Sequence, residues 1–171
     1  MHDEAVFHTQ PVGSSTVVRR SELDPNGKVV DYEKWTRPVT SDPTTDRIVM
    51  VVADPPGCQE VVLQSSMVPV YSTCTWDLKR LSSDGRHAVG LSPEFGWGVV
   101  NLVNSTPVLI FGEDDAVDAD SFQFDGSEQL NFVVRHAGLS AIATCTLDDR
   151  RCWQASPWSS TPYILVQPNW A

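Results

Sequence analysis

A short phrase built around an Asp-Gly pair occurs twice in this chain, and its spacing constrains the fold more than any other feature. The first copy covers residues 81–90 (LSSDGRHAVG) and the second covers residues 122–132 (FQFDGSEQLNF). Each copy predicts a strand end, a tight turn and a second strand. The glycines of the two turns, Gly85 and Gly126, are 41 residues apart. A period of this length predicts a repeated unit of four β-strands.

The order of strands and turns around this phrase also repeats. An apolar strand at 97–103 and a returning strand at 108–111 follow the first copy, and an equivalent hairpin at 59–63 and 68–73 precedes it. Pro69 marks the last of these as an edge strand because proline cannot donate to a sheet ladder. We predict one domain over 1–171, with units at about 38–78, 79–119 and 120–160, a partial unit at 1–37 and a tail strand at 161–171.

These units predict an all-β, β-propeller-like fold of about three and a half to four blades, each a four-stranded antiparallel sheet. No window keeps the apolar spacing of an amphipathic helix, while 12 prolines and 10 glycines separate short β-rich runs. A β-sandwich also has short, regularly spaced strands, but it need not repeat the order of its turns every 40 or so residues. The propeller is therefore favoured over the sandwich.

Two arrangements of the chain ends remain open. In one, residues 162–167 pair with residues 5–9 and close a small four-bladed ring. In the other, the chain is half of a larger propeller, which we favour because the first unit starts in the middle of the pattern. An open arc exposes strand edges, which favours pairing with a second copy as a homodimer.

The four cysteines favour two local disulfides. Cys58 and Cys74 lie at equal distances from the middle of one predicted hairpin, and Cys145 and Cys152 do so in another. Facing residues on adjacent antiparallel strands have Cα atoms about 4.5–5.5 Å apart, within the range of a disulfide. Two disulfides predict an extracellular or cell-envelope location. The alternative is four buried free thiols, whereas zinc is disfavoured because no C-x-x-C occurs and the histidines are scattered.

The phrase at residues 82–86 (SSDGR) resembles the S-P-D-G-R phrase of WD40-like and TolB-like β-propellers, with Ser83 in place of proline. The cysteine-flanked segments 58–74 and 142–152 are similar to outer hairpins of secreted actinobacterial propeller-like proteins. The resemblance covers residues 40–160. It implies the fold, and it implies little about function because such repeats serve many unrelated roles.

Composition limits the partners. The chain has 22 acidic and 12 basic residues, a net charge of −10, which disfavours nucleic acid and anionic lipid as partners. No apolar run approaches the roughly 20 residues of a membrane span. The polar start of the chain predicts no signal peptide within it.

Candidate catalytic and metal-binding groups each have a simpler interpretation. The acidic cluster at 113–120 offers carboxylates that could bind calcium, but it lacks the glycine and the spaced glutamate of an EF-hand. A solvent-exposed connection between units is therefore favoured, and no metal or cofactor is predicted. His87 could act as a general base oriented by Asp84, but a histidine after an Asp-Gly turn usually packs or caps that turn. No serine lies in a G-x-S-x-G elbow, and no nucleotide-binding motif occurs.

The chain has six tryptophans, which divide into two groups. Trp35, Trp76, Trp97 and Trp153 lie at strand ends and are predicted to be buried between sheets. Trp158 and Trp170 lie in the tail and are predicted to be accessible for contact with a partner.

The leading functional hypothesis is a non-enzymatic extracellular or envelope-associated module that binds a protein or another ligand. One alternative is a hydrolase or lyase whose active site lies in the propeller funnel, where several acidic, histidine or arginine side chains would have to converge. Another alternative is a structural half of a larger propeller whose function lies in the missing part.

Overall fold

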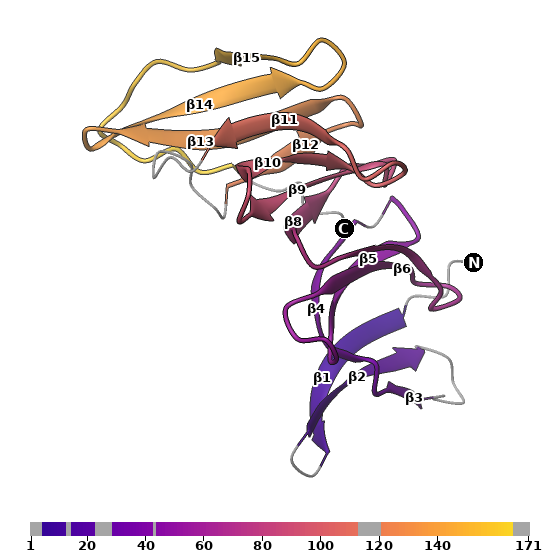
Figure 1. Ribbon diagram of the computed structural model, residues 1–171. Coiled ribbons are helices and arrows are strands. Elements are labelled where there is room, and N and C mark those ends of the chain that lie inside the picture. The colour runs from indigo at the N-terminus through magenta and orange to yellow at the C-terminus, as the bar shows by residue number, and fades with distance from the viewer. Residues whose placement is uncertain (1–4, 13–14, 23–28, 43, 113–120, 166–171) are drawn as a thin grey trace. The chain divides into compact units, whose positions relative to one another are not determined.

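The computed structural model describes residues 5–12, 15–22, 29–42, 44–112 and 121–165, and before residue 32 it describes the backbone alone. Every regular element in this part of the chain is a β-strand, which confirms the all-β prediction (Figure 1). The described residues form no helix long and apolar enough to cross a membrane. The chain divides into two compact units, Met1–Leu78 and Lys79–Ala171.

The first compact unit contains a three-stranded and a four-stranded antiparallel sheet. Strands that follow one another in sequence are neighbours in both sheets, so every connection within a sheet is a hairpin. The three-stranded sheet lies in the partial unit predicted at 1–37, and Pro69 begins the edge strand of the other sheet as expected. The strands are β1 (Ala5–Val12), β2 (Ser15–Glu22) and β3 (Val29–Tyr32), then β4 (Trp35–Asp42), β5 (Arg47–Val52), β6 (Gln59–Leu63) and β7 (Pro69–Thr73).

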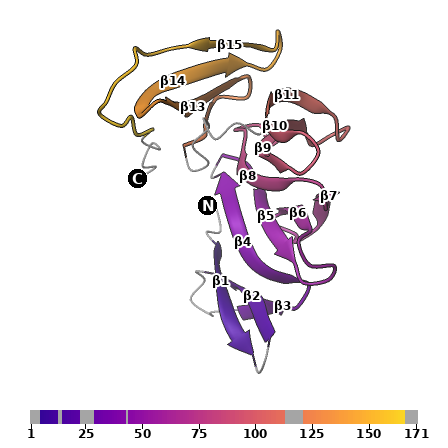
Figure 2. The ribbon, with the colours of Figure 1, turned by 60° about the vertical axis from the view of Figure 1, so that its left-hand side comes forward.

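The second compact unit is made of two four-stranded antiparallel sheets with the same consecutive strand order (Figure 2). The first sheet contains β8 (Asp77–Leu81), whose first two residues precede the unit boundary, and β9 (His87–Ser92), β10 (Gly96–Asn101) and β11 (Pro107–Gly112). The second contains β12 (Gln123–Asp125), β13 (Gln129–His136), β14 (Leu139–Thr146) and β15 (Arg151–Gln154).

The repeated Asp-Gly phrase forms equivalent turns in these two sheets. Gly85 connects β8 to β9 with a φ of 66°, and Gly126 connects β12 to β13 with a φ of 70°. Only glycine adopts this left-handed conformation readily, because it has no Cβ. The N–H of Gly85 donates to the Ser82 carbonyl at 2.8 Å, which closes the first turn. The repeat in the sequence therefore corresponds to a repeat in the structure.

Each compact unit has an apolar cluster. In the first, Trp35, Met50 and Cys58 pack with residues of β5 and β6. In the second, a larger cluster joins the β8–β11 and β12–β15 sheets, and it includes four tilted aromatic rings. The ring centroids are 5.0 Å apart for Trp97 and Phe122, 5.7 Å for Phe122 and Phe132, and 4.8 Å for Phe111 and Phe132.

One carboxylate lies in the interior of the first compact unit. Glu60 is only 8% exposed, and its Oε2 accepts a hydrogen bond from the indole Nε1 of Trp35 at 2.8 Å. Its Oε1 forms an ion pair with Lys34 Nζ at 2.8 Å, while the Lys34 side chain remains half exposed. Both carboxylate oxygens therefore have partners, as burial of a charge requires. We interpret this pair as a structural feature of the β3–β4 connection.

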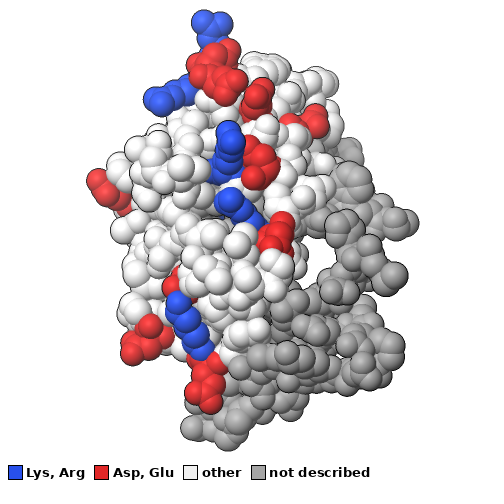
Figure 3. All heavy atoms as spheres, turned by 90° about the vertical axis from the view of Figure 1, so that its right-hand side faces the viewer, with Lys and Arg blue, Asp and Glu red and all other residues white. Residues whose placement is uncertain are grey.

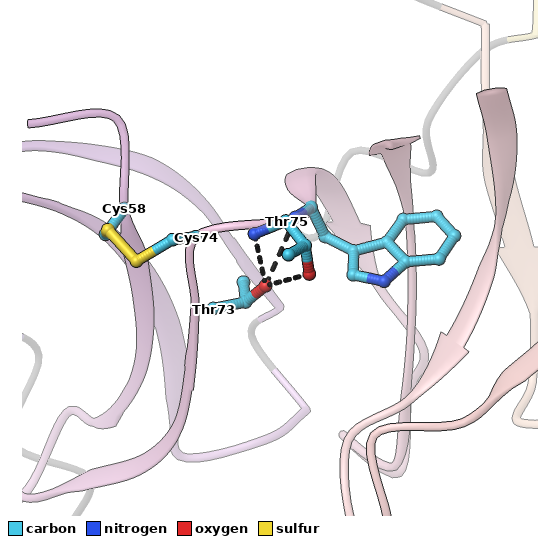
Figure 4. The surroundings of a disulfide bond; sticks show 5 residues. Cys58, Thr73, Cys74 and Thr75 are labelled. Atoms are coloured by element: carbon cyan, nitrogen blue, oxygen red, sulfur yellow. Dashed lines mark hydrogen bonds between the residues drawn. A yellow bond between two sulfur atoms is a disulfide. The ribbon is translucent and has the colours of Figure 1, made fainter. Parts of the chain in front are cut away.

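The two predicted disulfides are both present. Cys58 is bonded to Cys74 and Cys145 to Cys152, with Cα separations of 4.1 and 4.0 Å. The expected register is also observed, because Cys145 lies directly opposite Cys152 between β14 and β15. Figure 4 shows the first disulfide beside Thr73, whose Oγ1 accepts hydrogen bonds from the backbone N–H groups of Thr75 and Trp76. Each disulfide joins a buried cysteine to an exposed one.

Candidate interaction surface

The tail of the chain is attached to the start of β14. Ser159 and Ser140 exchange two backbone hydrogen bonds, of 2.8 and 2.9 Å. Farther along the tail, the N–H of Tyr163 donates to Ser140 Oγ at 3.2 Å, and the Tyr163 hydroxyl donates to the Pro157 carbonyl at 3.2 Å. Residues 162–165 of the expected tail strand form no strand, and residues 166–171 lie outside the described part of the chain.

This attachment holds an exposed aromatic side chain over the end of the β13–β14 hairpin. The ring of Trp158 packs against that of His136, with centroids 6.2 Å apart, and 42% of Trp158 remains exposed. Leu139 is directly opposite His136 in the hairpin and is 39% exposed. Ile164 follows Tyr163 and is 81% exposed. We call His136, Leu139, Trp158, Tyr163 and Ile164 the tail surface.

The tryptophan predictions are confirmed at four positions and wrong at one. Trp35, Trp76 and Trp97 are buried, and Trp158 is accessible. Trp153 was expected in the interior, but it is 47% exposed. Trp153 lies on the edge strand β15, directly opposite Thr144 of β14. Thr144 is next to Cys145, so the Trp153 side chain lies on the face opposite the apolar cluster that contains Cys145. Trp170 lies outside the described residues.

His87 and Asp84 do not form the pair that a general base would need. Asp84 Oδ1 accepts hydrogen bonds from Ser82 Oγ at 2.7 Å and from the Arg86 N–H at 3.0 Å, so the carboxylate caps its own turn. The Nε2 atom of His87 lies 3.4 Å from Asn101 Nδ2, and its Nδ1 atom is buried without a hydrogen-bond partner among the described residues. The turn is thus capped by Asp84, while the His87 side chain lies near Asn101 of the neighbouring strand β10.

The same contacts set the ionisation of Asp84. Partial burial by itself raises the pKa of this carboxyl group. The hydrogen bonds from Ser82 and Arg86 and the electrostatic interactions with His87 and Arg86 together lower it by more, so the net pKa lies below the ordinary value. Because the folded pKa is depressed, the carboxylate stabilises the fold fully above the unfolded pKa of about 3.9 and loses this effect as the pH falls through the folded value.

Replacing Asp84 with alanine is therefore expected to lower the free energy of unfolding by about 1 kcal/mol at pH 7, because the turn loses two hydrogen bonds to a charged acceptor. The difference from wild type should be smaller at about pH 1.5, because the carboxylate loses its stabilising effect as the pH falls through the lowered folded pKa. Urea unfolding at both pH values measures this. Asp84→Asn keeps an acceptor oxygen and should have a smaller effect, and an equal loss for the alanine variant at both pH values would contradict the prediction.

The described residues contain no group of three or more metal-ligating side chains. The acidic cluster at 113–120 lies outside the described part of the chain, so its interpretation as a solvated connection stays a prediction. On the face drawn in Figure 3, basic and acidic side chains are intermixed and do not form a one-signed patch.

No protein-family model matches the chain, and no curated protein matches it. Solved structures match its fold. The uncharacterized protein lmo1340 from Listeria monocytogenes EGD-e aligns over 91% of this chain and 52% of its own, with a TM-score of 0.59 and 13% identity. Hsv2 from Kluyvelomyces marxianus aligns over 86% and 56%, with a TM-score of 0.50 and 14% identity.

The β-propeller domain of Cps50 (Swd1) from Myceliophteria thermophila also aligns, over 86% of this chain and 57% of its own, with a TM-score of 0.49 and 11% identity. The chain therefore spans about half the length of the solved structures it matches. At these identities the likeness concerns the fold alone. Together with the consecutive strand order and the repeated turns, it identifies the chain as an all-β protein with the fold of a partial β-propeller.

Proposed function

We propose that this chain is a non-enzymatic β-propeller module that binds a protein or another ligand outside the cytoplasm through its tail surface. The observation that carries the proposal is the exposed Trp158, which is packed on His136 and attached to a sheet by the tail. Exposed aromatic side chains dominate the binding energy of many interfaces, because they bury a large area with few rotatable bonds.

The attachment of the tail favours binding as well. The hydrogen bonds of Ser140 to Ser159 and to Tyr163 fix the tail backbone at the residue after Trp158 and at the residue before Ile164. A surface that is ordered before binding loses less conformational entropy when its partner arrives. Leu139, which is paired with His136, and Ile164, which follows Tyr163, are also exposed apolar residues. The tail surface thus combines an aromatic anchor with a fixed backbone.

The proposed location is supported by the two disulfides. Disulfides persist in oxidising compartments and are rare in the cytosol, where thiols are kept reduced. All four cysteines of the chain are paired. This chemistry is compatible with a secreted or envelope-associated protein.

The experiment compares wild type with Trp158→Ala on arrays of glycans and of purified extracellular proteins. Trp153→Ala is the matched control, because that tryptophan has similar exposure on the opposite face of the same sheet. A ligand of the tail surface should bind Trp158→Ala at least about tenfold more weakly, the usual effect of removing an anchor residue, and Trp153→Ala as well as wild type. Equal binding by both variants would contradict the proposal. The proposal that the module is non-enzymatic would be contradicted if wild type turned over ester, phosphate or glycoside substrates and His87→Ala did not.

A second candidate is supported by the alignments, in which the chain spans about half of the structures it matches. In this case the chain is a structural half of a larger propeller, and function resides in the other half. The same arrays separate the two candidates, because ligand binding by this chain alone that depends on Trp158 would contradict the structural role.

A further inference from the structure

The turn between β10 and β11 carries a modification motif that the binding proposal does not use. Residues 104–106 read Asn104-Ser105-Thr106, which is the N-x-[ST] acceptor sequence for N-glycosylation with a residue other than proline in the middle. The other four asparagines of the chain, at positions 26, 101, 131 and 169, are not followed two residues later by serine or threonine. The chain therefore has a single such motif, and it occurs in a hairpin turn.

The backbone of this turn is fixed by its own hydrogen bonds. The N–H of Asn101 donates to the Thr106 carbonyl and the N–H of Ser105 donates to the Asn101 carbonyl, both at 2.9 Å. Asn101 Oδ1 accepts a further hydrogen bond from the N–H of Val103 at 2.8 Å. Ser105 adopts the left-handed conformation, with a φ of 61°. This geometry places the motif at the tip of the hairpin, where Asn104, Ser105 and Thr106 are all exposed.

Within the motif, the threonine is bonded to the asparagine side chain. Asn104 Oδ1 accepts hydrogen bonds from the Thr106 hydroxyl at 2.6 Å and from the Thr106 backbone N–H at 3.2 Å. A backbone N–H can only donate, so the accepting atom must be the amide oxygen and the other amide atom is Nδ2. Among the described residues, Nδ2 has no hydrogen-bond partner. The nucleophilic nitrogen is therefore available, and donors to Oδ1 polarise the amide.

We propose that Asn104 is an acceptor for N-linked glycan. This inference rests on the proposed location outside the cytoplasm, because the glycan must be added during export. The co-reactant is a glycosyl diphosphate donor that is presented by a transferase of the export pathway. The Asn104 Nδ2 atom bonds to the anomeric carbon of the donor, and the bond from that carbon to the diphosphate oxygen breaks. The diphosphate leaves with the electron pair, and one Nδ2 proton passes to a base of the transferase.

The glycan would lie beside an exposed apolar side chain. Val103, next to Asn104, is 75% exposed, and no neighbouring element of the fold covers it. A bulky, hydrated substituent at the next residue solubilises such a surface. The position is also compatible with the fold, because the side chain that receives the glycan lies outside the apolar cluster of the second compact unit.

The test expresses the full chain behind a cleavable signal sequence in a eukaryotic host that adds N-glycans, and it measures the intact mass before and after an amidase that releases N-glycans. Wild type should carry a glycan that the amidase removes, leaving aspartate at position 104. Asn104→Gln and Thr106→Val should be secreted without it. Thr106→Ser, which keeps the hydroxyl donor, should retain it. Peptide mapping should place the aspartate at position 104 alone.

The outcomes separate this inference from the proposed function. In one outcome, wild type is secreted with both disulfides formed but without glycan, while a control glycoprotein from the same cells is modified. This outcome would overturn the glycan site alone. In another outcome, wild type folds only with four free thiols and is not exported. This outcome would overturn the proposed location and the glycan site together. A glycan retained in Thr106→Val would overturn the role of the threonine hydroxyl.

Discussion

Replacing Phe132 with alanine is expected to destabilise the second compact unit by about 3–5 kcal/mol, the usual cost of removing a buried aromatic ring. Phe132 is 3% exposed and packs against Phe111 and Phe122, with ring centroids 4.8 and 5.7 Å away. Tilted aromatic pairs at these distances add to the free energy of burial. Phe132 lies opposite Ala143, whose small side chain cannot fill the space. Denaturant unfolding followed by tryptophan fluorescence measures the loss.

Two control variants test whether the effect comes from packing in this cluster. Phe132→Leu keeps apolar volume and is expected to cost less than half as much. Trp153→Ala removes a larger ring that is 47% exposed, and it should cost about 1 kcal/mol or less. If Phe132→Ala lowered the free energy of unfolding no more than Trp153→Ala, the aromatic cluster would not stabilise the second unit as described.

Removing either disulfide is expected to cost about 2–3 kcal/mol, with the larger loss for the longer loop. The Cys58–Cys74 bond closes a separation of 16 residues and the Cys145–Cys152 bond one of 7. In the chain-entropy account, this difference corresponds to about 3 against about 2.5 kcal/mol, because a longer loop has more freedom to lose when it is unfolded. The double alanine variants of each pair, compared by denaturant unfolding under oxidising conditions, measure both values.

The β8–β11 sheet supplies a matched control for the second disulfide. If the two Asp-Gly turns are aligned, Val99 opposite Leu109 occupies the place of Cys145 opposite Cys152. Val99, Leu109 and Cys145 belong to the same apolar cluster. The variant Cys145→Val/Cys152→Leu should therefore be more stable than the double alanine variant, because valine at the buried position 145 restores apolar area without the covalent bond. Equal free energies of unfolding for the two variants would contradict this expectation and would show that the cysteine pair stabilises the fold only through the disulfide bond.

Local patterns in the sequence were sufficient to predict the strands and turns. The Asp-Gly turns at Gly85 and Gly126 depend on residues within a few positions of each glycine, and both are observed. The pairing of Cys145 with Cys152 could be predicted because a hairpin fixes its own register around its turn. The turn before His87 was similarly predictable, since Ser82 and Asp84, which cap it, lie within a few residues of Gly85.

The exposure of the tryptophans could not be predicted in the same way. Trp97 and Trp153 both lie on strands within repeated units, yet one is buried and the other is 47% exposed. Trp97 lies on an inner strand and packs against Phe122, the residue before β12 of the neighbouring sheet, whereas Trp153 lies on an edge strand. Which side of an edge strand is covered depends on elements that are distant in sequence. The contact of Trp158 with His136 likewise joins segments that no local pattern relates.

The sequence by itself determined the all-β class, the repeated four-stranded units and the partners of the cysteines, because hairpins are governed by interactions between residues close together in the chain. The tertiary structure decided which aromatic side chains form the interior, where the tail attaches and which atoms of Asn104 are engaged. These features depend on packing between sheets and on the direction of individual side chains. A local residue pattern does not specify them, because it does not determine which residues distant in sequence come into contact in the folded chain.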